Sequence, residues 1–250
     1  MISDDGIPRL AGSGQMQVIL EWGLSGVQAL LDRADAFVIV DVLSFSTCVD
    51  VACSRGAQVF PFPIHDRDAA VVEAARRNAE LAGKRSDNTA RFSLSAPTLK
   101  DVPDGTRLVL PSPNGSHLSF WAKEKTVLAG CLRNANAVAK MAMRAVGDGT
   151  LAVIPAGERW ADGSLRPAIE DLIGAGAIIS GLTGSLSPEA IVARDAFNSA
   201  QPDLFDRLIG SVSGVELRER GFPQDVEIAA SLNVSSCAPI LQEGAYIAAR

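Results

Sequence analysis

The sequence has few residues of the kinds that zinc and disulfide chemistry use. Only two histidines, His65 and His117, and four cysteines occur among its 250 residues, and no two cysteines form a Cys-x-x-Cys pair. A multi-histidine zinc site is therefore not expected. The cysteines all lie in apolar segments, so we expect reduced, buried side chains.

Long apolar runs and runs of like charge are also absent. Asp41 interrupts the longest apolar candidate, 36–43, well short of the roughly 18 residues of a membrane span. Residues 1–15 lack the basic and apolar blocks of a secretory signal. The net charge is −6, and an acidic chain without a basic run is a poor ligand for nucleic acid. These absences predict a cytoplasmic protein that binds neither membranes nor nucleic acid.

What is present is the composition and pattern of an ordinary globular domain, with 47% apolar and 21% charged residues. Apolar runs of strand length alternate with segments of helical periodicity, which predicts an α/β fold: a largely parallel or mixed sheet with helices on both faces. The expected strands are 17–22, 36–43, 57–62, 107–110, 125–129, 151–155, 226–230 and 246–249, and the expected helices are 26–31, 48–54, 67–81, 116–123, 134–145, 167–182, 187–197, 203–210 and 214–220.

We expect residues 1–250 to form one α/β unit. The polar stretch 83–106, which contains Pro97 and Pro103, breaks the alternation. It is either a long functional loop or a junction between two lobes. The sequence leaves the assembly state open, a homo-oligomer included.

Polar side chains follow several predicted strands, at the edge where parallel sheets bind ligands. Helix N-termini at that edge attract anions, and arginines bind phosphate with two parallel hydrogen bonds. We therefore expect a phosphate site there. Its candidate residues are Ser44, Ser46 and Thr47 after the second strand, Asn114, Gly115 and Ser116 after the fourth, and Arg133 and Asn134 after the fifth.

Carboxylates predict a metal at the same edge. Asp41, Glu158, Glu170 and Asp171 supply hard oxygen ligands, and such ligands without histidines suit Mg²⁺. Arg166 adds a cation beside them. The motifs of P-loop, Rossmann and nucleophile-elbow proteins are absent.

Each of these candidates also has a structural interpretation. Asp41 could accept backbone hydrogen bonds at the end of a buried strand, and Ser46 and Thr47 could cap a helix. The Asn-Gly pair at 114–115 is a turn dipeptide. Glu170 and Asp171 could stabilise a helix dipole, and Arg166 could be a solvated surface group.

The same segments resemble the 2-phosphosulfolactate phosphatase (ComB) family over nearly the whole chain. That resemblance implies an α/β fold and a Mg²⁺-dependent phosphatase that converts 2-phosphosulfolactate to sulfolactate and phosphate, a step toward coenzyme M. The segments that carry it are Glu-Trp-Gly at 21–23, Val-Asp-Val-Leu-Ser-Phe-Ser-Thr at 40–47, Ser-Pro-Asn-Gly-Ser at 112–116, Leu-Arg-Asn-Ala at 132–135, Ile-Pro-Ala-Gly-Glu at 154–158, Asp-Gly-Ser-Leu-Arg-Pro at 162–167, Glu-Asp-Leu-Ile-Gly-Ala-Gly at 170–176, and 213–221 with Asp225.

On this hypothesis Asp41, Glu158 and either Glu170 or Asp171 bind Mg²⁺, and the phosphate lies against the residues at 46–47 and 114–116. Arg133 and Arg166 contact the phosphate or the acid groups of the substrate, and either water or Asp41 attacks phosphorus.

Two differences from many family members concern the substrate: Ser44 replaces an arginine, and Leu-Ser-Ala-Pro at 94–97 replaces Gly-Asn-Ser-Pro. The substrate could therefore be another small phosphorylated acid. Two other classes remain open: an inactive α/β protein that binds a phosphorylated or sulfonated acid, and an enzyme of transfer or isomerisation.

Overall fold

The computed structural model of the chain describes residues 14–63, 67–87 and 89–249. His65 lies outside these ranges. The strands of the main sheet are β1 (Gln17–Leu20), β2 (Ala36–Val40), β3 (Gln58–Pro63), β4 (Glu80–Leu81), β5 (Arg107–Ser112), β6 (Thr126–Gly130), β7 (Thr150–Pro155), β10 (Ser185–Leu186), β11 (Pro239–Gln242) and β12 (Ala245–Ala248). A separate antiparallel pair consists of β8 (Glu158–Arg159) and β9 (Leu165–Arg166).

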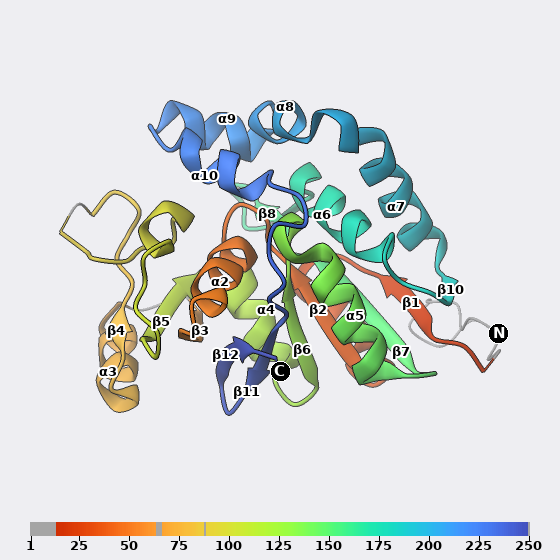
Figure 1. Cartoon of the computed structure of the whole chain (residues 1–250), viewed down its shortest axis with the longest axis horizontal. Coiled ribbons are helices and arrows are strands. Elements are labelled where there is room, and N and C mark those ends of the chain that lie inside the picture. Colours follow the sequence, from red (N-terminus) through yellow and green to blue (C-terminus); the bar gives the residue numbers. More distant parts are fainter. Residues whose placement is uncertain (1–13, 64–66, 88, 250) are drawn as a thin grey trace.

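The helices alternate with these strands along most of the chain (Figure 1). The α-helices are α1 (Gly23–Leu30), α2 (Phe45–Ser54), α3 (Arg67–Arg77), α4 (Gly115–Ala122), α5 (Ala135–Val146), α6 (Ile169–Ile179), α7 (Pro188–Ala200), α8 (Leu204–Ile209), α9 (Val212–Glu219) and α10 (Pro223–Ala229). Three short 3₁₀ segments are η1 (Ala96–Leu99), η2 (Leu132–Asn134) and η3 (Gln201–Asp203).

Ten strands of the described residues form one sheet in the order β10-β1-β7-β2-β6-β11-β12-β3-β5-β4. The first five of these strands are mutually parallel, and so are the last three. The antiparallel hairpin β11–β12 lies between the two groups and pairs antiparallel with each. Three antiparallel pairings therefore separate β6 from β3.

Strand β2 lies at the centre of the core, and every one of its residues has zero exposure. Val38 and Val40 pack on one face with side chains of α5 and α6. Phe37 and Ile39 pack on the other face with side chains of α1, α2 and α4. A strand covered on both faces needs the continuous apolar sequence seen here. The predicted α/β class, with a mainly parallel sheet and helices on both faces, is confirmed.

One predicted strand is wrong. Residues 226–230 were expected to be extended, but they belong to α10 and its C-terminal end. Pro223 and Asp225 lie in its first turn, where proline and acidic residues favour a helix. Val226 and Ala229 are buried at helical spacing in the core. Strand β11 and the two-residue strands β4, β8, β9 and β10 were not predicted. The helix predicted at 67–81 ends at Arg77, and its last two residues form β4.

Helices α7 to α10 arch over the edge of the sheet at which β2 ends (Figure 1). Helix α10 contacts η1 and η2 there. The four cysteines are buried and free. No helix within the described ranges is long and apolar enough to cross a membrane. Because α10 covers the edge of the sheet at which β2 ends, it also covers the turn after β2, in which the sequence placed part of its candidate site.

Candidate active site

Asp41 joins the starts of two helices. Its Oδ1 accepts a hydrogen bond from the backbone N–H of Phe45 at 3.0 Å, and its Oδ2 accepts one from Gly115 N–H at 2.9 Å. These are the first residues of α2 and α4, whose N-terminal dipoles favour an anion. Burial raises the pKa of Asp41, and the two backbone hydrogen bonds oppose that rise. The carboxylate thus brings together the turns that follow β2 and β5.

Asp171, in the first turn of α6, makes a second junction of the same kind. Its Oδ1 accepts from Val42 N–H at 2.7 Å, and its Oδ2 accepts from Gly157 N–H at 2.9 Å. Burial, followed by the nearby charge of Asp41, raises the pKa of Asp171 well above its usual range. The turns after β2 and β7 therefore meet at this carboxylate.

Glu158 lies where these turns converge. Its Oε2 accepts a hydrogen bond from Asn114 Nδ2 at 2.9 Å, and it pairs with Arg166 across the β8–β9 ladder. Burial, followed by the charge of Asp41, raises the pKa of Glu158 to about 7. A carboxyl group with such a pKa can accept or donate a proton near neutral pH.

Glu170 completes a group of four carboxylates, which we call the acidic cluster: Asp41, Glu158, Glu170 and Asp171. Its side chain is 2% exposed, and its charge contributes to the raised pKa of each of the other three. Within the part of the chain that the structure describes, the side chain of Glu170 forms no hydrogen bond or ion pair. A buried carboxylate of this kind favours a compensating cation.

The donor set of the acidic cluster fits a lightly coordinated Mg²⁺ rather than a closed metal cage. No group of three His, Cys, Asp or Glu side chains among the described residues surrounds a ready metal position. Both oxygens of Asp41 and of Asp171 already accept backbone hydrogen bonds. Magnesium is usually bound through one or two carboxylates plus water and substrate phosphate. Glu170 and its neighbours in the cluster can supply the carboxylates.

The predicted hydroxyl ligands are already donating to backbone carbonyls. Ser46 Oγ donates to Ile39 O at 2.9 Å, Thr47 Oγ1 to Val42 O at 2.8 Å, and Ser116 Oγ to Leu110 O at 2.9 Å. All three side chains are buried. They attach the first turns of α2 and α4 to the preceding strand or turn, and their contact with phosphate stays a prediction.

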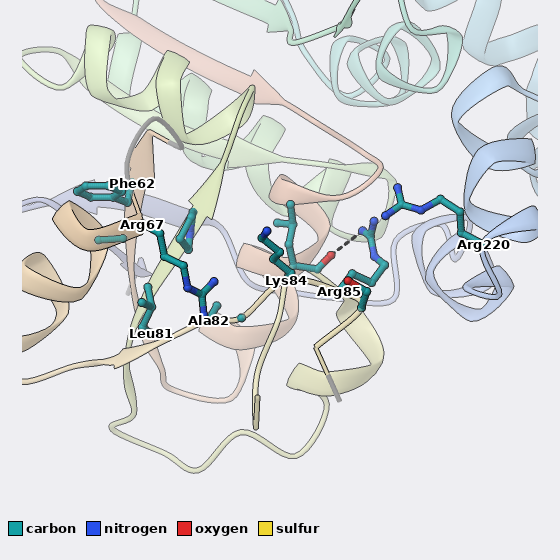
Figure 2. A pocket seen from close by; sticks show the side chains of 12 residues that line it. Phe62, Arg67, Leu81, Ala82, Lys84, Arg85 and Arg220 are labelled. Atoms are coloured by element: carbon teal, nitrogen blue, oxygen red, sulfur yellow. Dashed lines mark hydrogen bonds between the residues drawn. The ribbon is translucent and has the colours of Figure 1, made fainter. Parts of the chain in front are cut away.

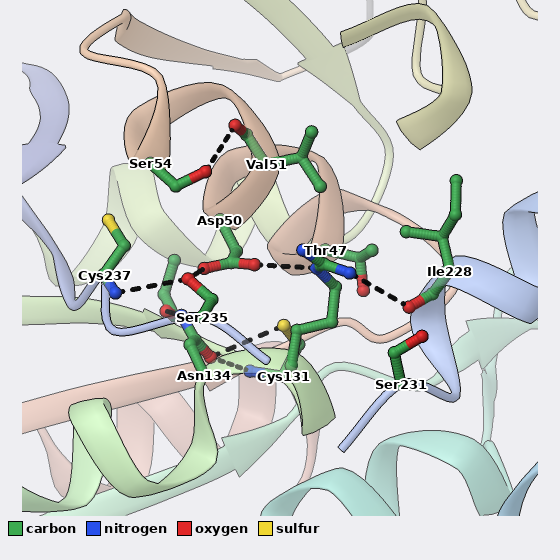
Figure 3. Close-up of polar contacts among 12 residues, drawn as sticks. Thr47, Asp50, Val51, Ser54, Cys131, Asn134, Ile228, Ser231, Ser235 and Cys237 are labelled. Atoms are coloured by element: carbon green, nitrogen blue, oxygen red, sulfur yellow. Dashed lines mark hydrogen bonds and ion pairs between the residues drawn. The ribbon is translucent and has the colours of Figure 1, made fainter. Parts of the chain in front are cut away.

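Arg133 and Asn134 form polar contacts outside the acidic cluster, and Figure 3 shows the surroundings of Asp50, Ser235, Asn134 and Cys131. Arg133 Nε donates to Asp50 Oδ2 at 2.8 Å, and Ser235 Oγ donates to Asp50 Oδ1 at 2.6 Å. Asn134 Oδ1 accepts from Cys131 N–H at 2.9 Å. Asp50 has no exposed surface, so Arg133 here compensates a buried charge of α2. Among the described residues, the Arg133 side chain donates hydrogen bonds to Asp50 and to Ile228 O, and not to the acidic cluster.

Arg166 is held between β9 and the C-terminal helices. It is 8% exposed, its Nη2 donates to Ser213 Oγ at 3.4 Å, and it lies 3.9 Å from Glu216 Oε1. Its guanidinium stands 5.8 Å from the ring centre of Trp160. Arg166 is thus a positioned, buried cation next to Glu158, unlike a solvated surface group.

Arg85 is a site residue that the sequence did not single out. Its Nη2 donates to Ser44 Oγ at 2.8 Å, and its Nε lies 3.8 Å from Asp225 Oδ2. Its positive charge lowers the pKa of Asp41, against the larger effect of burial. Arg85 lies in the stretch 83–106, where no predicted strand end marks a site; the Lys-Arg pair at 84–85 was the available signal.

Comparison with known proteins gives a consistent family. The sequence profile described as 2-phosphosulpholactate phosphatase matches residues 26–244. A protein of Methanothermobacter thermautotrophicus named 2-phosphosulfolactate phosphatase is 32% identical over 83% of this chain and 87% of its own length. One of Carboxydothermus hydrogenoformans, named as a probable 2-phosphosulfolactate phosphatase, is 31% identical over 85% of this chain and 89% of its own. A protein of Thermus thermophilus with that same probable name is 28% identical over 83% and 88%.

Proposed function

The chain belongs to the 2-phosphosulfolactate phosphatase family, and we propose that it hydrolyses the phosphate ester of 2-phosphosulfolactate, or of a similar small phosphorylated hydroxy acid. Water forms the new P–O bond, the ester P–O bond breaks, and the products are the hydroxy acid and phosphate. The observation that carries the proposal is the acidic cluster, formed where the turns after β2, β5 and β7 meet.

Water is a better nucleophile than Asp41 in this arrangement. Both carboxylate oxygens of Asp41 accept backbone hydrogen bonds from helix starts, which lowers their nucleophilicity. Glu158 has an oxygen outside its hydrogen bond with Asn114 and a pKa of about 7. We assign to the Glu158 carboxylate the acceptance of a proton from the attacking water.

Mg²⁺ is the cofactor that the acidic cluster suits, and Glu170 is the first residue we expect to bind it. When bound, the ion would offset the charge on the phosphoryl oxygens. Arg85 and Arg166 lie close enough to Asp41 and Glu158 to act on their pKa values, and both can steer an anionic substrate toward the cluster.

The test is phosphate release from 2-phosphosulfolactate after EDTA treatment and again after Mg²⁺ is restored. We expect activity to disappear with EDTA and to return with Mg²⁺. Glu170→Gln should lose most of it, whereas Glu219→Gln, which neutralises an exposed carboxylate of α9, should not.

The other results have definite meanings. Full activity in EDTA would remove the metal from the proposal. Binding of sulfolactate without any phosphate release would favour a binding protein. Phosphate release from neither 2-phosphosulfolactate nor 2-phospholactate would reject the phosphatase.

A further inference from the structure

A basic cavity of about 330 Å³ lies beside the acidic cluster and is not part of it. Figure 2 shows its lining, which comes from the end of β3, the start of α3, β4 with the residues that follow, and Arg220 after α9. Four cationic residues line it, Arg67, Lys84, Arg85 and Arg220, and none of the described lining residues is acidic. We call this space the basic cavity.

Two of the four cations of the basic cavity are uncompensated, whereas Arg67 and Arg85 have the charges of Asp87 and Asp225 near them. Lys84 and Arg220 form no side-chain hydrogen bond or ion pair with any residue in the described ranges. The Nε of Arg85 is buried and has no hydrogen-bond partner there, although Asp225 stands 3.8 Å away. A chain of net charge −6 therefore gathers four cations around one space. Such an arrangement attracts anions, and guanidinium groups recognise acid oxygens in particular.

The basic cavity and the acidic cluster are joined through two short connections. Arg85 lines the cavity and donates to Ser44, which lies in the same turn as Asp41. Pro111 also lines the cavity, and the turn after it supplies Asn114 to Glu158. A ligand that spans both would have one end in the cavity beside Arg85 and the other at the turns that hold Asp41 and Asn114.

We propose that the basic cavity binds the acid group of the substrate that is not hydrolysed, a sulfonate or a carboxylate. This inference rests on the proposed function and makes Arg67, Lys84 and Arg220 specificity-determining residues. The remaining walls include Phe62, Leu81 and Leu94, which provide apolar contact for the carbon atoms between the two charged ends.

The experiment replaces three exposed cations of the cavity together, in the variant Arg67→Gln/Lys84→Gln/Arg220→Gln. Its matched control, Arg55→Gln/Lys100→Gln/Arg144→Gln, removes the same charge from exposed positions that do not line the cavity. For 2-phosphosulfolactate we expect the cavity variant to raise KM by about tenfold or more with little change in kcat. For 2-phosphoglycerol, which has no second acid group, KM should be the same in both variants.

Binding of sulfolactate, measured by calorimetry, separates the cavity from the phosphatase activity. If no phosphate ester is hydrolysed but sulfolactate binds the unaltered chain and not the cavity variant, the basic cavity is supported and the proposed function fails. Equal affinity for sulfolactate in the cavity and control variants would overturn the inference. So would an equal rise in KM for 2-phosphoglycerol, or failure of the unaltered chain to bind sulfolactate.

Discussion

Asp41 is buried and Glu158 is half-buried, and their different hydrogen bonds predict different effects of replacing each carboxylate by an amide. Asp41 uses both oxygens to accept backbone N–H groups. Glu158 uses one oxygen, which accepts from Asn114. An amide keeps one accepting oxygen and turns the other into a donor. Neutralising the two residues should therefore have opposite effects on stability.

Asp41→Asn should destabilise the protein and reduce its activity. The new amide NH₂ must face either Phe45 N–H or Gly115 N–H, so one buried donor loses its acceptor. That loss costs about 1–3 kcal/mol, which corresponds to a fall in Tm of several degrees. Turnover should drop about tenfold or more, because two turns of the site lose their junction. Thermal unfolding and phosphate release measure both effects.

The matched control is Asp195→Asn, the same chemical change at an exposed position on α7. It should leave Tm and turnover near their original values. An Asp41→Asn protein as stable as the unaltered chain would mean that the two backbone hydrogen bonds do not need a carboxylate.

Glu158→Gln should stabilise the metal-free protein at high pH. The folded pKa of about 7 lies above the ordinary 4.5, so the folded state binds the Glu158 proton more tightly than the unfolded state. Ionisation of Glu158 therefore destabilises the folded state. This effect is absent below about pH 4.5, grows as pH rises and is complete above about pH 7. The glutamine oxygen can still accept from Asn114. We expect Tm in EDTA to exceed that of the unaltered chain at pH 8 and to match it near pH 5, together with a large loss of turnover.

At the scale of elements, the hairpin β11–β12 joins the two parallel groups, and Tyr246 is its buried anchor. The Tyr246 ring has zero exposure and meets Phe45 edge to face at 6.1 Å. Ser119 Oγ donates its single proton to Gly115 O, so the Tyr246 hydroxyl is the donor in the 2.7 Å bond between Tyr246 and Ser119. The hairpin is thereby attached to the middle of α4.

Replacing Tyr246 in two steps separates the hydroxyl from the ring. Tyr246→Phe should cost about 1 kcal/mol, the net value of a buried hydrogen bond. Tyr246→Ala should cost about 3–5 kcal/mol, because it also removes a large buried ring. Urea unfolding measures both values. Equal losses in the two variants would show that the ring packing contributes little.

The sequence predicted the elements best where their apolar pattern is long and local. The continuous apolar run of β2 and the strand–helix alternation are such patterns, and they yielded the fold class. Strand β11 was missed because Pro239–Gln242 is short and depends on pairing with β12 and β6. The segment at 226–230 was misread because its β-branched residues suggested a strand, whereas Pro223 and burial in the core favour a helix.

The candidate site was predictable where residues follow strand ends. That rule located the four carboxylates and Asn114, which the structure brings together. It did not locate Arg85 or Asp225, because their interactions join segments far apart in the sequence. Only the Lys-Arg pair at 84–85 marks Arg85 locally, and Asp225 entered through the family resemblance alone. Nor did it distinguish Arg133, whose partner Asp50 is an acidic residue inside an otherwise apolar helix.

For the whole molecule, the buried carboxylates set the direction of stability with pH. Burial raises the pKa values of Glu21, Asp41, Asp50, Asp171 and Asp225, as it does for Glu158. Each such group binds its proton more tightly in the folded state, so its contribution to stability falls as pH rises above the ordinary value near 4. Glu73, with a pKa lowered to about 2, acts oppositely, but its effect changes only below about pH 4.5.

The metal-free protein should therefore have a higher Tm at pH 5.5 than at pH 8, and Mg²⁺ should reduce or reverse that difference. The acidic cluster carries more negative charge at pH 8 than at pH 5.5, so a cation stabilises it more at pH 8, whereas at pH 5.5 protons compete with the metal. A ligand at about one hundred times its Kd stabilises by about 2.7 kcal/mol, which for a chain of this size is a rise in Tm of roughly 5–10 °C. Thermal unfolding at both pH values, in EDTA and in Mg²⁺, with NaCl at matched ionic strength as control, measures the effect. Metal-free protein that is more stable at pH 8, or an equal response to NaCl, would contradict an ionised cluster that binds Mg²⁺.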